Sequence, residues 1–249
     1  MSRFFLAFTL GFAAVAGAGT PVPEGLTEAT RSEILTSIGK GLRYLEQNQK
    51  PDGSWEGDLG ITGLAVLSFL RSPEAAGKPA SPHVDRALAY ITAHAKPDGG
   101  IYVRDLPNYY TAIALKAIVA SGKPEYAALA EKATEFLKGL QADEGEGYTP
   151  DQKFYGGIGY GSAIRPDLAN LEFALSALSD AAVPSEDPLW KKAILFVQRT
   201  QNRSESNDQA WASDDGGFVY YPGFSYHVDG GTASYGSTTY AGVLSYAWA

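Results

Sequence analysis

The sequence predicts an all-α protein built from repeated helix pairs. Three observations predict this fold: a helix-forming segment recurs four times, a glycine-rich turn follows each copy, and an apolar segment follows each turn. One pair cannot bury its own apolar face, so successive pairs are expected to stack side by side. The repeats cover residues 32–249 and supply four pairs.

The first helix of each pair is expected to be amphipathic and to lie on the outside. Each copy has a basic residue, a small residue, an aromatic residue four positions after the base, and an aliphatic residue next to the aromatic. The four copies are KGLRYLEQNQ from Lys40, RALAYITAHA from Arg86, KATEFLKGLQ from Lys132 and KAILFVQRTQ from Lys192. Three copies end in glutamine, namely Gln49, Gln141 and Gln201, and the second has Ala95 there.

The turns contain glycine, which allows a tight chain reversal without a Cβ clash. They are PDGSW from Pro51, PDGGIY from Pro97, YGGIGY from Tyr155 and DDGGFVYY from Asp214. Insertions at 142–154 and 202–213 precede the third and fourth turns, so the last two repeats lie further apart.

The second helix of each pair is expected to be buried on all sides, because its residues are nearly all apolar or small. The four segments are TGLAVLSFL from Thr62, TAIALKAIV from Thr111, LEFALSALS from Leu171 and TYAGVLSYA from Thr239. In the first repeat we expect Gln49 to hydrogen-bond the end of its helix or the turn beyond, because the last helix carbonyls lack partners. Trp55 is expected to cover the junction.

The first copy resembles the QW repeat of squalene and hopene cyclases, on Lys40, Gly41, Tyr44, Gln49, Gly53 and Trp55. The same repeat recurs in the β subunits of protein prenyltransferases. The resemblance covers about residues 32–249 and implies an α/α toroid with a central cavity. Members of that family close with about six pairs. Because four are present and the apolar run TTYAGVLSYAWA reaches Ala249, we expect a toroid truncated at its C-terminus.

Three aspartates precede the second helices and are candidates for catalysis: Asp58, Asp105 and Asp167. Asp at such positions caps the helix and complements its dipole, so capping is the simpler interpretation. In an apolar cavity, an Asp with a raised pKa could instead act as a Brønsted acid. Asp167 follows Arg165, which we expect to hold it ionised.

The Asp-x-Asp-Asp motif with which the resembling cyclases protonate their substrate is absent. The nearest segment, Ala212-Ser213-Asp214-Asp215, lacks the first Asp and lies in a turn. The chain has no cysteine, so the zinc site of prenyltransferase β subunits and the complement-type thioester do not transfer. We expect no metal and no cofactor. His227 and Asp229 have a loop-chelate spacing, but two ligands do not make a zinc site.

Aromatic residues between the turns and the second helices are expected to line the cavity mouth, where they suit an apolar molecule or a glycan. These candidates are Tyr109, Tyr160, Tyr220, Tyr226 and Tyr235, with His227 and Asp229 beside them. Packing of the long loops onto the rim is an equally good interpretation.

The N-terminus predicts export. Arg3 is followed by an apolar run and by AVAGAG, which is typical of a signal peptide at residues 1–18, with a linker at 19–31. The apolar run is too short to span a membrane, so no stable span is expected after cleavage. The formal net charge of −8 argues against a nucleic-acid partner, because no basic stripe is present to neutralise phosphates.

Two classes of function remain. An exported toroid without the acid motif would be a periplasmic or extracellular binding or scaffold module. The alternative is an enzyme: a terpene cyclase-like or prenyltransferase-like enzyme acting on an isoprenoid, or a polysaccharide lyase.

Overall fold

The computed structural model describes residues 24–75, 81–161 and 165–249, so the predicted signal peptide lies outside the described residues. Those residues form eight α-helices and no extended strand. None of the helices in these three ranges combines the length and the apolar character that crossing a bilayer requires. The predicted all-α class is confirmed.

The helices alternate as the repeats predict. The first helices of the pairs are α1 (Glu28–Asn48), α3 (Pro82–Thr92), α5 (Ala127–Lys138) and α7 (Pro188–Thr200). The second helices are α2 (Leu59–Arg71), α4 (Pro107–Ser121), α6 (Leu168–Asp180) and α8 (Gly236–Trp248). Helix α1 begins inside the segment 19–31 that the sequence assigned to a linker, because Thr27 caps it by accepting a hydrogen bond from the Thr30 amide at 3.2 Å.

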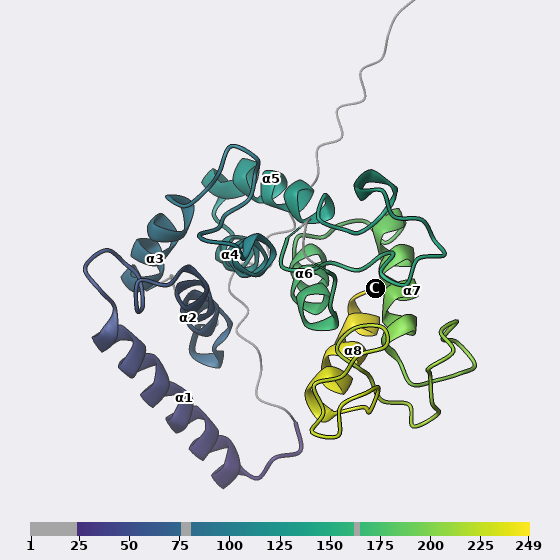
Figure 1. Ribbon diagram of the computed structural model, residues 1–249. Helices are drawn as coiled ribbons and strands as arrows, with labels where there is room; N and C mark the ends of the chain where they lie inside the picture. The colour runs from purple at the N-terminus through teal and green to yellow at the C-terminus, as the bar shows by residue number, and fades with distance from the viewer. Residues whose placement is uncertain (1–23, 76–80, 162–164) are drawn as a thin grey trace, which may run out of the picture.

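The second helices form a continuous row in which α2 packs on α4, α4 on α6, and α6 on α8 (Figure 1). The first helices cover this row from one side. Most of the buried apolar side chains come from α2, α4 and α6 and from the covering faces of α3, α5 and α7. The row is the core of the molecule.

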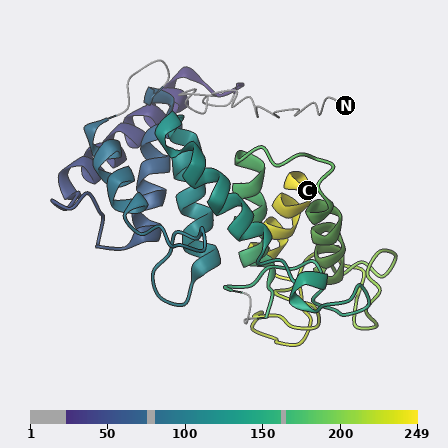
Figure 2. The ribbon, with the colours of Figure 1, turned by 90° about the horizontal axis from the view of Figure 1, so that it is seen from above.

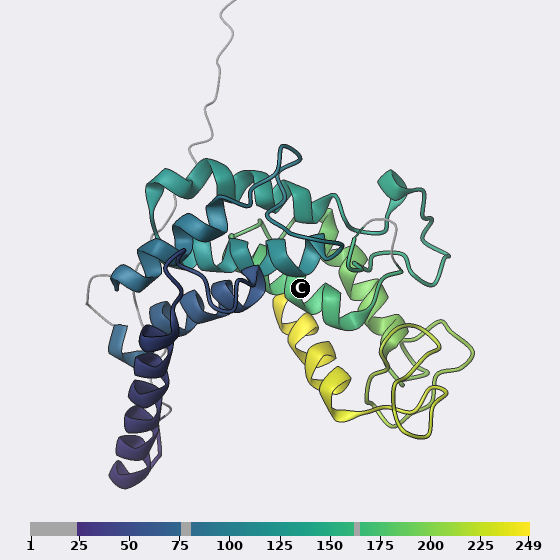
Figure 3. The same cartoon turned by 60° about the vertical axis from the view of Figure 1, so that its left-hand side comes forward.

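The row is curved, and α1 and α8 form the two ends of an arc (Figures 1 and 3). Helix α1 packs on α2, and α8 packs on α6 and α7. The described residues therefore form an open arc of helix pairs. They do not close a ring.

Glutamine side chains fasten the first and third turns to the next outer helix. The Gln49 amide Nε2 donates to the Gly53 carbonyl at 2.9 Å and to the His83 carbonyl, at the start of α3, at 2.8 Å. Gln141 repeats this pattern with Gly156 and with Leu189, at the start of α7, both at 3.0 Å. The glutamine thus bonds the turn, as expected, and also bridges two repeats.

The Trp55 side chain is buried at the first junction, with 4% of its surface exposed. Its indole Nε1 donates to the Leu45 carbonyl of α1 at 2.9 Å. The expected position of the ring is confirmed. In contrast, Lys40, Gly41 and Tyr44 of the same motif lie on an exposed face of α1, and Tyr44 keeps 66% of its surface accessible.

Candidate functional site

Two of the three candidate aspartates cap second helices. Asp58 accepts from the Ile61 amide at the start of α2, and Asp167 accepts from the Asn170 amide at the start of α6, each at 3.0 Å. Both therefore stabilise helix N-termini, as capping preferences predict.

Asp105 does not cap its helix. It is exposed, and Leu106 is the residue that precedes α4 without providing a side-chain cap. Pro107 occupies the first helical position, where its lack of an N–H removes one of the amides that a cap would serve. The expectation that Asp105 caps its helix is wrong.

Asp167 lies at the centre of the candidate site, with 1% of its surface exposed. Burial raises the pKa of this carboxyl above its ordinary value, against the opposing effects of Asn170, Tyr220 and Arg165. The expectation that Arg165 dominates is wrong, because the cost of burying the charge exceeds the attraction of the arginine. The Asn170 side chain also donates to Asp167, at 2.8 Å.

Tyrosines connect the two capping aspartates. The Tyr220 hydroxyl interacts with the Asp167 carboxylate and with the Tyr160 hydroxyl, and burial raises the pKa of Tyr220 far above its ordinary value. Tyr160 lies near Tyr109. We call these four residues, together with Tyr110 and Asp58, the tyrosine–aspartate cluster.

The cluster ends at Asp58. The Tyr109 and Tyr110 rings meet edge to face with their centroids 5.6 Å apart, and the Tyr110 hydroxyl donates to Asp58 at 3.2 Å. Burial raises the pKa of both phenols. The cluster is thus a neutral, hydroxyl-rich surface between two carboxylates.

Main-chain contacts hold the cluster in place. The Asn108 amide, at the start of α4, donates to the Tyr160 carbonyl at 3.0 Å, and the Leu168 amide, at the start of α6, donates to the Tyr220 carbonyl at 2.9 Å. The third turn therefore fixes the start of α4, and the fourth turn fixes the start of α6.

The loop after the fourth turn adds an aromatic surface beside the cluster. Tyr221 stacks on Phe224 at 4.6 Å, and Tyr226 contacts both Phe224 and Tyr220 at 4.9 and 4.8 Å between centroids. The Arg165 guanidinium lies 3.7 Å from the centre of the Tyr221 ring. Figure 2 shows this loop and the two insertions gathered at one end of the helices.

The remaining candidates lie at the edge of this region. Tyr235 precedes α8, and its pKa is raised by burial, with smaller contributions from Tyr226 and Asp167. His227 Nδ1 lies 3.2 Å from the Asp229 carboxylate, whose side chain is 79% exposed. Within the described ranges, no three His, Cys, Asp or Glu side chains are grouped as a metal site would need.

The sequence reasoning missed two charged residues in the second helices. Burial raises the pKa of Glu172 on α6, with Lys116 on α4 and Trp248 on α8 beside it. The Lys116 ammonium lies 3.4 Å from Asp180 and 5.8 Å from the Trp248 ring. A signal was present, because Glu172 and Lys116 interrupt otherwise apolar segments.

The structure brings together most of the tyrosine candidates with Asp58 and Asp167, and it leaves Asp105, His227 and Asp229 outside. The chain matches no protein-family model.

Proposed function

We propose that this protein is an exported, non-catalytic binding module with the toroid architecture that its QW repeat implies. The observation that carries the proposal is the state of the candidate acids. Asp58 and Asp167 have their carboxylates engaged by helix amides and by Tyr or Asn side chains, and Asp105 lies on the surface. A Brønsted acid must present its proton to a substrate, and none of the three is arranged to do so.

The side chains around the tyrosine–aspartate cluster favour a hydroxylated, ring-shaped ligand, such as a saccharide. Tyr226 is 64% exposed next to the cluster, so one aromatic face is free for stacking. The phenols of Tyr160 and Tyr220 and the Arg165 guanidinium lie beside it and offer hydrogen bonds to hydroxyl groups. An apolar isoprenoid would gain from the rings but would offer no hydrogen bonds to the polar groups beside them.

A glycan array followed by calorimetric titration tests this proposal. Tyr226→Ala should weaken binding of a retained glycan by roughly tenfold, because the stacking face is lost. Val228→Ala, on a side chain 95% exposed in the same loop, is the matched control and should bind normally. If the array retains nothing while vesicles containing a polyprenol do bind the protein, the saccharide proposal is wrong.

One observation favours the enzyme alternative. Glu172 is partly buried on the row of second helices, and burial raises its pKa, as a general acid requires. It neighbours Phe173, whose ring contacts Tyr109 at 5.2 Å. These groups could protonate an isoprenoid double bond and stabilise the resulting cation.

A turnover assay separates the two functions. The purified protein is incubated with an acyclic isoprenoid, and the products are analysed by mass spectrometry. The Glu172→Gln variant and the control Glu131→Gln, at an exposed residue of α5, are analysed in the same way. The binding proposal expects no cyclised product from any sample. Product formed by the native protein and by Glu131→Gln, but lost in Glu172→Gln, would establish the enzyme instead.

A further inference from the structure

Arg165 is a half-buried cation without an anionic partner. The central carbon of its guanidinium lies 3.7 Å from the centroid of the Tyr221 ring. It forms no ion pair among the described residues, and these residues include every Asp and Glu of the chain. Its Nη1 is buried and has no hydrogen-bond partner in the same ranges, where no other charged group has such an atom. The charge of Arg165 is therefore not compensated by a carboxylate of the chain.

The nearby Asp167 does not neutralise this charge. Its carboxylate accepts hydrogen bonds from the main-chain amide and the side chain of Asn170, at 3.0 and 2.8 Å. It is 1% exposed, so a molecule bound at the surface would not touch it. A charge that is partly withdrawn from water is costly unless an anion pairs with it. Arg165 thus offers a place for an anionic group of a ligand.

A second cation lies on the same group of rings. Lys153, in the first insertion, is exposed, and its ammonium lies 4.8 Å from the centroid of the Phe154 ring. The centroids of the Phe154 and Tyr221 rings are 6.1 Å apart. Lys153 also has no ion-pair partner among the described residues. Two cations therefore lie on two neighbouring aromatic rings.

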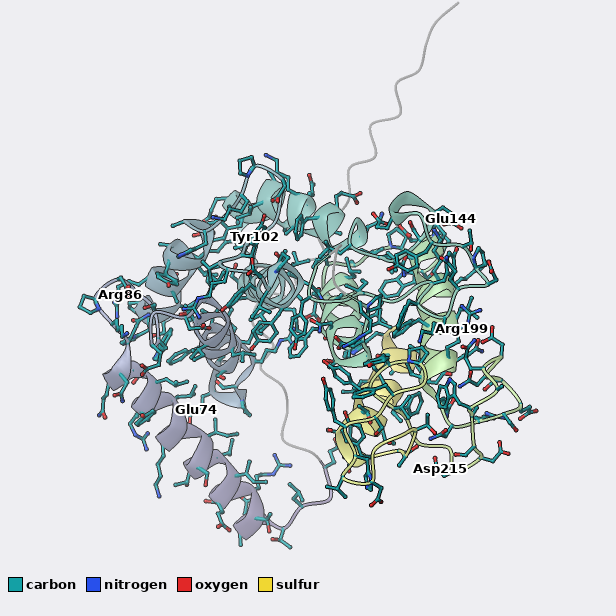
Figure 4. All side chains as sticks on the ribbon, viewed as in Figure 1. Glu74, Arg86, Tyr102, Glu144, Arg199 and Asp215 are labelled. Carbon is teal, nitrogen blue, oxygen red and sulfur yellow. The ribbon has the colours of Figure 1, made fainter. Side chains whose placement is uncertain are left out.

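Arg199 of α7 fixes the insertion that carries Lys153. Its side chain is nearly fully buried and lies where the two insertions meet (Figure 4). It donates to the Pro150 and Gln152 carbonyls of the first insertion at 2.7 and 2.8 Å, and to the Asp208 carboxylate of the second at 2.6 Å. The rings and cations are thus held in one arrangement before a ligand binds, which lowers the entropic cost of binding.

We infer that the saccharide bound at the aromatic surface of Tyr221, Phe224 and Tyr226 is acidic, with a carboxylate or sulfate group placed on Arg165. This inference rests on the proposed saccharide binding and adds the charge of the ligand. A guanidinium presents parallel N–H donors that match two oxygens of such a group. Phe224 connects the two positions, because its ring contacts both Tyr226 and the Tyr221 ring under Arg165.

The acidic group must be recognised by local contact. The formal net charge of −8 repels an anionic ligand at long range, so the protein as a whole does not attract it. Attraction between distant charges is largely screened at physiological salt, whereas a half-buried pair is screened much less. A preference for the acidic ligand should therefore persist at physiological salt, and all titrations are made there.

Two matched ligand pairs test the inference by titration calorimetry. An oligogalacturonate is compared with its fully methyl-esterified form, and lactose sulfate is compared with lactose. The native protein should bind at least one acidic ligand roughly tenfold more tightly than its neutral counterpart, because hydrogen bonds to a charged group are stronger than neutral ones. The pair that shows the preference identifies the acidic group.

Three charge-removing variants assign the preference to residues. Arg165→Gln should weaken binding of the acidic ligand by roughly tenfold and leave its neutral counterpart unchanged. Arg43→Gln, at an exposed residue of α1, makes the same change in net charge and should keep the full preference. Lys153→Gln alters an exposed side chain that makes no hydrogen bond to the fold, so it should stay folded and reduce the preference by about two- to threefold.

The outcomes separate this inference from the saccharide proposal. Equal binding of both members of each pair, or a glycan array that retains neutral glycans only, would overturn the inference and leave saccharide binding intact. An Arg165→Gln variant that weakens acidic and neutral ligands equally would also overturn it, because the arginine would then act only on the structure of the site. An array that retains nothing would overturn both.

Discussion

At the scale of single residues, the Trp55 side chain is buried at the first junction, between α1 and α2. Trp55→Ala should lower the free energy of unfolding by about 3–5 kcal/mol, because it leaves a cavity between α1 and α2. It also removes the hydrogen bond to the Leu45 carbonyl. Urea denaturation measures the loss, with Val228→Ala as an exposed control expected to change stability by less than about 0.5 kcal/mol. A loss at Trp55 no larger than the control's would place the ring outside the core.

Titration of Glu172 makes the stability of the folded protein depend on pH. Its pKa is raised in the folded state, so the folded protein holds this proton at pH values where the unfolded chain has released it. The contribution to stability is therefore present below the unfolded pKa and is lost as the pH rises through the folded pKa.

Glu172→Gln removes this loss, because glutamine has no charge to bury. The variant should be more stable than the native protein at neutral pH, and the difference should shrink as the pH falls towards the ordinary glutamate pKa of 4.5. Urea unfolding at a series of pH values measures it, with Glu131→Gln as the exposed control. A constant difference across the series would mean that titration of Glu172 is not its cause.

At the scale of helices and turns, the four glycine turns look alike in sequence but differ in what docks on them. Gly156→Ala should cost at least about 3 kcal/mol, because strain at positive φ adds to a collision with the Lys192 main chain. Gly216→Ala should cost about 1 kcal/mol, because only the strain remains.

Thermal or urea unfolding compares the stability losses of the two variants. Equal losses would show that the fourth turn is packed like the third.

The sequence predicted these elements better than it predicted their contacts. Periodicity and turn glycines located all four pairs, and capping preferences identified the roles of Asp58 and Asp167. The prediction that Asp105 caps α4 was wrong, because Pro107 removed the need for a cap. Glu172 was missed, because attention to apolar periodicity discounted the one charge in its segment.

Contacts between repeats could not be predicted, because they depend on how neighbouring pairs rotate against each other. The glutamine bridge from Gln141 to Leu189 joins residues far apart in the chain. The meeting of Tyr160, Tyr220 and Asp167 likewise depends on the curvature of the row, which no single repeat encodes.

At the scale of the whole molecule, each pair is stabilised mainly by its neighbours, so weakening one junction should release the pairs beyond it. Gln141 is 2% exposed and bridges the third and fourth pairs. Gln141→Ala leaves the Gly156 and Leu189 carbonyls without their donor, which should cost about 1–3 kcal/mol.

That loss should be local. Amide hydrogen exchange should accelerate first in α7 and α8, while α2 and α4 keep their protection, because the first two junctions remain intact. Gln201→Ala is the matched control. Its Nε2 donates to the Gly216 carbonyl and its Oε1 accepts from the Tyr246 hydroxyl at 3.3 Å, and neither bond reaches an outer helix, so the variant should cost less and leave α7 protected. If Gln141→Ala instead raised exchange equally in all helices, the chain would unfold as one cooperative unit. The junctions would then not act as separate nearest-neighbour interfaces.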